Sequence, residues 1–83
     1  MILKYITMEM NEFIANFADQ FDDTEASVLT PETIFRELDE WSSMIALSVM
    51  AMINEEYDVQ IKADEMRNAQ TIQQLYDVVS SKL

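Results

Sequence analysis

Two adjacent serines, Ser42 and Ser43, stand immediately before a long apolar run from Met44 to Ile53. Serine is a preferred residue at the start of a helix, so the pair is predicted to begin one. A serine hydroxyl becomes a nucleophile when an adjacent base activates it, and no neighbouring residue in the sequence could serve as that base. A hydroxyl presented in this way suits modification by another enzyme better than catalysis. We therefore interpret the pair as an attachment point.

The composition excludes several classes of protein. The chain has no histidine and no cysteine, which removes imidazole and thiolate chemistry, disulfides and ordinary zinc sites, so no metal site is predicted. Nothing in the pattern selects two of the sixteen acidic residues as an acid–base pair, and no catalytic residue is predicted. The net charge of -11 argues against nucleic acid and anionic membrane surfaces as partners and favours a basic protein surface.

The length of 83 residues predicts one small domain over residues 1–83. The segment from Met1 to Thr7 is too short and too interrupted for the apolar core of a signal peptide, and no run reaches transmembrane length. We expect a cytoplasmic, monomeric protein without membrane insertion. Because Met8 could be a second start, residues 1–7 are expected to form a disordered extension.

Three segments have helical periodicity. The first is predicted from about Met8 to about Gln20, and the second from Ser42 or Ser43 to about Tyr57. The third begins at Thr71, which forms a capping box with Gln74. The apolar residues of the first and third segments are Met10, Phe13, Ile14, Phe17, Phe21, Ile72, Leu75, Tyr76 and Val79.

The connections carry their own signals. Thr30-Pro31-Glu32 is typical of a helix start, so a short helix is expected within the long connection of residues 22–40. Asp64 to Asn68 could form one helical turn before the last helix. The chain has no glycine, and Asp58 is predicted to supply the positive φ that ends the second helix. The fold class is all-α: a small bundle of three main helices, a short helix before the last, and a long loop between the first two.

The run from Met44 to Ile53 contains one polar residue, Ser48, and is wider than the apolar stripe of a surface helix. It indicates either a central helix covered on most sides, which we favour, or an apolar surface for a partner or a lipid-like ligand. The sequence does not settle which face is buried. Trp41 is expected to anchor the core or the loop, and the stripe of Phe13, Phe17 and Phe21 is expected in the core.

The order of these elements resembles the acyl carrier protein family and its peptidyl carrier relatives, from about Glu9 to the end of the chain. The family has a serine at the start of its second helix, usually within Asp-Ser-Leu, and Ser42-Ser43-Met44 lies over that triplet. The segment from Glu55 to Ile61 is similar to the family's Glu-Glu-Phe-Gly-Ile-x-Ile, with Asp58 at the glycine position.

The resemblance implies that Ser43 carries a 4'-phosphopantetheine arm, with Ser42 as the N-cap and as a minor alternative attachment site. The arm would supply the thiol that the chain lacks and hold acyl groups as thioesters. A phosphodiester on Ser43 would lie at a helix N-terminus, which favours negative charge by about 0.3–1 kcal/mol. The implied partners are a phosphopantetheinyl transferase and acyl-loading and acyl-transfer enzymes with basic or mixed basic and apolar docking surfaces.

Two departures from the family pattern bear on the partners. Ser42 replaces the aspartate before the attachment serine, and Asp39 and Glu40 are expected to compensate for the missing charge. The second helix also lacks acidic residues along its middle. Partner binding is therefore expected to use Glu55 and Glu56 at its end, and apolar contacts around a set of residues near its start, namely Met44, Ile45 and Ser48.

Two other functions are compatible with parts of the pattern. A peptidyl carrier for an aminoacyl group fits the same pattern, but the short and very acidic chain favours a stand-alone acyl carrier in fatty-acid, polyketide or related biosynthesis. A small acidic helical inhibitor of a basic enzyme would explain the charge but not the serine pair or the apolar helix. We hypothesise that the carrier serves a dedicated pathway, because it departs from the family pattern in these two ways.

Overall fold

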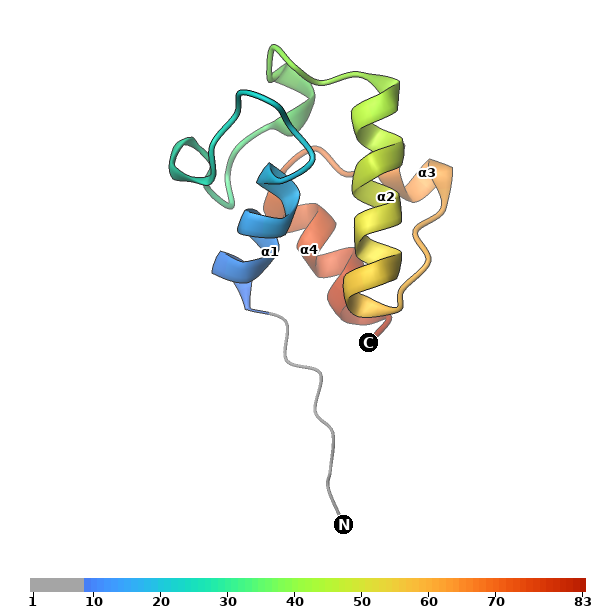
Figure 1. The fold of residues 1–83 in the computed structure, drawn as a ribbon. Helices are drawn as coiled ribbons and strands as arrows, with labels where there is room; N and C mark the ends of the chain where they lie inside the picture. Colours follow the sequence, from blue (N-terminus) through green and yellow to red (C-terminus); the bar gives the residue numbers. More distant parts are fainter. Residues whose placement is uncertain (1–8) are drawn as a thin grey trace.

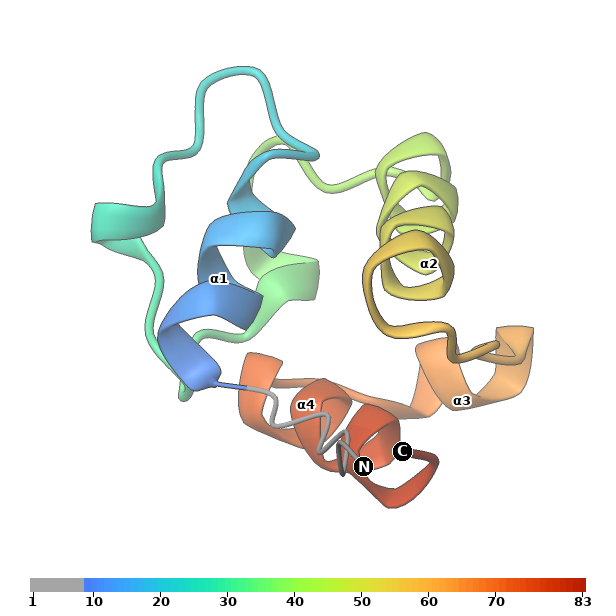
Figure 2. The same cartoon turned by 60° about the horizontal axis from the view of Figure 1, so that its bottom comes forward.

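The computed structural model describes residues 9–83, so the expected extension of residues 1–7 lies outside the described residues. Helices α1 and α2 stand side by side, α4 lies across their lower end, and the short α3 lies next to α2 (Figures 1 and 2). The predicted bundle is confirmed. The elements in chain order are α1 (Met10–Ala18), the 3-10 helices η1 (Ala26–Val28) and η2 (Phe35–Glu37), α2 (Ser43–Tyr57), α3 (Ala63–Asn68) and α4 (Ile72–Ser81).

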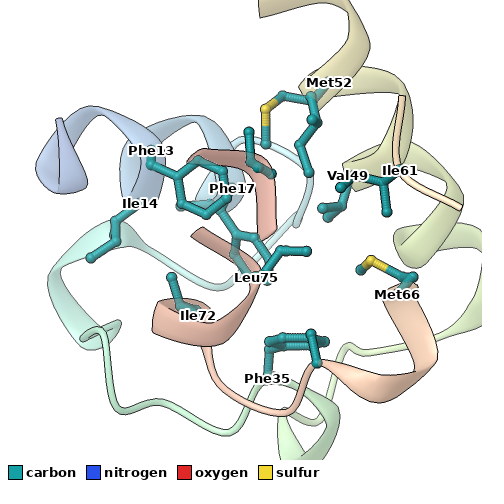
Figure 3. Close-up of a cluster of buried hydrophobic side chains, with 14 of the residues drawn as sticks. Phe13, Ile14, Phe17, Phe35, Val49, Met52, Ile61, Met66, Ile72 and Leu75 are labelled. Atoms are coloured by element: carbon teal, nitrogen blue, oxygen red, sulfur yellow. The ribbon is translucent and has the colours of Figure 1, made fainter. Parts of the chain in front are cut away.

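The core lies where the four α-helices and η2 meet (Figure 3). Some of its side chains come from the apolar stripes predicted in the first and third segments, whereas Phe35, Ile61 and Met66 come from the connections and were not predicted. Burial of such side chains is the main favourable contribution to folding. Phe13 and Phe17 of α1 are fully buried and Phe21 nearly so, which confirms the aromatic stripe as core. The largest fully buried side chains are Phe13, Phe17, Phe35, Ile53, Ile72, Leu75, Val49 and Val79.

Local signals fix the ends of two helices as predicted. The Thr71 hydroxyl accepts a hydrogen bond from the Gln74 backbone N–H at 3.1 Å, and the Gln74 side chain accepts from the backbone of Gln70 at 2.8 Å, which forms the start of α4. Asp58 has φ 55° and ψ 39°, and its N–H donates to the Asn54 carbonyl at 3.0 Å. The left-handed residue therefore ends α2 without a glycine.

The predicted helix start at Thr30-Pro31-Glu32 is wrong. This segment is a turn in which the Thr33 hydroxyl accepts from the Thr30 N–H at 2.8 Å. The carbonyls of Pro31 and Thr33 accept hydrogen bonds from the first turn of α4 at 2.8 and 3.2 Å, so they are not available to continue a helix. The helical turn begins later, at Phe35. Helix α1 is also two residues shorter at each end than predicted.

Helix α2 is not covered on most sides, so the favoured interpretation of its apolar run is wrong. Val49, Met52, Ile53 and Tyr57 are buried and belong to the core. On the other side, Met44 is 77% exposed and Leu47 is 65% exposed. Apolar surface on α2 is therefore open to a partner or ligand.

Trp41 anchors the segment that leads into α2. Its ring lies parallel to that of Phe17, with an angle of 8° and 6.4 Å between centroids, and 4.8 Å from the ring of Phe35. Aromatic pairs at such distances stabilise packing beyond the area they bury. The prediction of Trp41 as an anchor is confirmed, and the residue fixes where the following serines lie.

Candidate functional site

The two serines have different roles at the start of α2. Ser42 has extended backbone angles, and its hydroxyl accepts a hydrogen bond from the Ile45 N–H at 3.2 Å, so it is the N-cap. Ser43 is the first residue of the helix and is exposed. Within residues 9–83 its hydroxyl has no hydrogen-bond partner, and neither a histidine nor a cysteine exists to activate it.

The first turn of α2 can bind an anion. The N–H of Ile45 is capped by Ser42, and that of Ala46 donates to the Ser42 carbonyl at 2.9 Å. The N–H groups of Ser43 and Met44 have no acceptor in the part of the chain that the structure describes. Unpaired N–H groups and the helix dipole both favour negative charge. A phosphodiester on the Ser43 hydroxyl would meet this first turn, so the residues present fit a phosphorylated prosthetic group.

Glu40, three residues before Ser43, holds the long connection in place. Its carboxylate accepts hydrogen bonds from the backbone N–H of Asp22 at 3.1 Å and of Asp23 at 3.0 and 3.1 Å, and from the Thr24 hydroxyl. The Thr24 hydroxyl and these N–H groups lower the pKa of the Glu40 carboxyl. Glu40 therefore contacts the loop, while the neighbouring Asp39 is exposed.

A groove with a volume of about 370 Å³ runs between α2 and α3 beside Ser43. Its lining is mainly apolar, and it includes two arginines, Arg36 and Arg67. The guanidinium of Arg36 donates to the backbone carbonyls of Met66 and Ala69 at the C-terminal end of α3, which joins η2 to α3. The other lining residues are Trp41, Ser43, Ala46, Leu47, Met50, Ala63 and Met66.

A second, polar pocket of about 210 Å³ lies between α1 and α2. It brings together Ser48, Glu55 and Glu56 of α2 with Asn16 of α1 and with Asp19 and Gln20, which follow α1. Acidic side chains of α2 and of the turn after α1 thus share one surface. Among residues 9–83 no group of three or more acidic residues is arranged to hold a metal ion.

A comparison with known families identifies the family of the chain. The family model described as "Phosphopantetheine attachment site" matches residues 11–79. The chain belongs to this family. The covalently attached group of the family is 4'-phosphopantetheine, and the resemblance to carrier proteins is confirmed. No significant match is found among curated proteins. None of the described helices of this carrier-family chain is long and apolar enough to cross a membrane.

Three of the residues expected to bind partners, Met44, Ser48 and Glu55, lie at spacings of four and seven along one side of α2. Met44 lies exposed next to Ser43, while Ser48, Glu55 and Glu56 line the polar pocket. Ile45 is half-buried and packs against the core. The groove residues Arg36, Arg67, Leu47 and Met50 are not among the site residues predicted from the sequence. A signal was present for the arginines, since they are two of only five basic residues in the chain.

Proposed function

We propose that this protein is a carrier that holds acyl groups as thioesters on a 4'-phosphopantetheine arm attached to Ser43. The observation that carries the proposal is the difference between the two serines. Ser42 uses its hydroxyl to cap α2, whereas the exposed Ser43 hydroxyl has no partner within residues 9–83. Ser43 is therefore better placed than Ser42 to accept the arm from coenzyme A.

The chain's own residues position the arm and do no bond-making chemistry. Ser42 and the N-terminal turn of α2 fix the Ser43 hydroxyl and provide N–H groups for a phosphate. A phosphopantetheinyl transferase must supply the base, because none lies at the site. When bound, the arm supplies a thiol for thioester formation, which a chain without cysteine cannot provide. This division of labour supports a carrier without catalytic activity of its own.

Exposed residues around Ser43 and at the end of α2 are proposed to bind the partners. Asp39, Met44, Glu55 and Glu56 are exposed, so they are available to acyl-loading and acyl-transfer enzymes. Glu40 contributes by holding the loop that precedes α2. The high negative charge favours partners with basic surfaces. We propose an acyl carrier in the cytoplasm, with a peptidyl carrier for an aminoacyl group as the alternative.

Intact-mass measurement tests the attachment site. The full chain is incubated with coenzyme A and a broad-specificity phosphopantetheinyl transferase, beside the variants Ser43→Ala and Ser42→Ala. We expect one phosphopantetheinyl group on the parent and on Ser42→Ala and none on Ser43→Ala. Modification of Ser43→Ala would move the site to Ser42. No addition with several transferases would instead favour an acidic binding protein.

A further inference from the structure

The groove between α2 and α3 is lined by positively charged side chains, although the chain as a whole is acidic. Four of the five basic residues fall in the described part of the chain, and two of these, Arg36 and Arg67, line the groove beside Ser43. The net charge of the whole chain is -11. Positive charge is therefore gathered next to the attachment site of an otherwise acidic protein.

The two arginines differ in their contacts. Arg36 is occupied, because its guanidinium donates to carbonyls of α3 and lies 5.6 Å from the ring centroid of Phe35. Arg67 is exposed and makes no hydrogen bond or ion pair through its side chain within residues 9–83, where the ion pair present joins Lys82 and Glu65. A position in the last turn of α3 explains a positive charge there. It does not explain a guanidinium at the edge of an apolar groove.

The shape of the groove limits its occupant. Along α2 it extends from Ser43 to Met50, about 10 Å at the helical rise, with Ala46 and Leu47 between them. Its volume of about 370 Å³ equals roughly a dozen water molecules, which is enough for a short acyl group. An apolar wall with one unpaired cation fits a short carbon chain that ends in an anion.

We propose that this groove holds a short acyl cargo with a terminal carboxylate, and that the Arg67 guanidinium pairs with this carboxylate. The proposal rests on the proposed function, since the cargo reaches the groove on the arm at Ser43. The phosphate of the arm is the other anion available, but the unpaired N–H groups of Ser43 and Met44 already face its expected position. Arg67 is thus a specificity residue for the cargo.

The test compares two cargoes that differ by one charge. Succinyl and butyryl groups have the same number of carbons, and the carboxylate of the first replaces the methyl of the second. Both are loaded as amide-linked coenzyme A analogues, so that the cargo does not hydrolyse. The carriers are the parent chain, Arg67→Gln, and Lys62→Gln as a control that removes the same charge from an exposed residue outside the groove. Intact mass establishes loading first, and a parent chain that does not load would refute the proposed function itself.

The readout is the pKa of the succinyl carboxyl, followed by NMR on a 13C label. An ion pair at an exposed site contributes about 0.2–1 kcal/mol, so the pKa should be about 0.2–0.7 units lower on the parent than on Arg67→Gln. Lys62→Gln should behave as the parent. Methyl signals of Leu47 and Met50 should shift with either cargo, because both chains lie against the apolar wall. Equal carboxyl pKa values on all three carriers would overturn the proposal.

A separate measurement distinguishes the phosphate of the arm. The 31P signal of the carrier with the unloaded arm is compared between the parent and Arg67→Gln. We expect no difference. If the 31P signal changes and the carboxyl pKa does not, Arg67 binds the arm phosphate and the assignment of a carboxylated cargo is wrong.

Discussion

The carboxylate of Glu40 accepts two hydrogen bonds from the backbone N–H of Asp23, at 3.0 and 3.1 Å, across 17 residues of sequence. This contact joins the loop after α1 to the segment that enters α2. Trp41 packs on the core from the next position, against Phe17 and Phe35. The chain leading to Ser43 is thus held at two consecutive residues, once by hydrogen bonds and once by aromatic packing.

The substitution Glu40→Gln is expected to loosen the loop. In glutamine an NH2 group replaces one of the two carboxylate oxygens. This group donates and does not accept, so the N–H groups of Asp22 and Asp23 lose an acceptor that they use. Hydrogen exchange at these two amides should become several-fold faster. Glu37→Gln, on the exposed surface of η2, is the control and should leave both rates unchanged. Unchanged rates in both variants would show that the contact does not hold the loop.

Two carboxyl groups should make stability depend on pH. Hydrogen bonds from Thr24 and from the backbone lower the pKa of Glu40, and the Lys62 N–H followed by the Lys82 side chain lowers that of Glu65. A lowered folded pKa means that the stabilisation is present above the ordinary value of 4.5 and is lost as the pH falls through the folded value.

The pH effect can be separated from the general relief of charge repulsion in acid. Urea unfolding is measured for the parent and for the double variant Glu40→Gln and Glu65→Gln at several pH values from 7 downward. At pH 7 the free energy of unfolding should be higher for the parent than for the double variant. This difference between the two proteins should shrink below the ordinary carboxyl pKa. A difference that grows in acid would contradict the assigned sign.

Because the Ser42 hydroxyl caps α2, replacing it should destabilise the protein. Ser42→Ala leaves the Ile45 N–H without its acceptor and should lower the free energy of unfolding by about 0.5–2 kcal/mol. Ser43→Ala should change stability by less, since the Ser43 hydroxyl makes no hydrogen bond within residues 9–83. Thermal or urea unfolding of both apo variants tests this. Equal losses would indicate that the two hydroxyls share the cap.

Removing one methylene group from a side chain of α2 should affect stability more on the buried side of the helix than on the exposed side. Ile53 is fully buried, so Ile53→Val should lower the free energy of unfolding by about 0.5–1.5 kcal/mol. Leu47 is mostly exposed, and Leu47→Val should change it by less than about 0.5 kcal/mol. Urea unfolding of the two variants compares them directly. A larger loss for Leu47→Val would mean that the orientation of α2 described above is wrong.

Asp58 is the one described residue with positive φ, and it is not a glycine. Asp58→Gly should raise the free energy of unfolding by up to about 1 kcal/mol, because glycine adopts φ 55° without a steric penalty. Asp58→Ala is the opposite control and should lower it. If Asp58→Gly destabilises the protein, the aspartate side chain contributes more than its backbone conformation.

Features that depend on a few neighbouring residues could be predicted from the sequence. The cap at Ser42, the capping box at Thr71 and the left-handed residue Asp58 each involve groups within four positions of one another. The bond between Glu40 and Asp23 and the bonds from Arg36 to α3 span 17 to 33 residues, and only the packed fold brings them together. For the same reason the apolar run could not reveal which side of α2 is buried.

The exposed side chains of Met44 and Leu47 set a timescale for this protein. Burying two such side chains contributes at most about 3–6 kcal/mol, which by itself corresponds to a dissociation constant no tighter than about 40 µM. At ordinary association rates of about 10⁶ per molar per second, such a complex lasts no longer than about 25 ms. Short-lived complexes suit a carrier that must dissociate from one enzyme before it can bind the next.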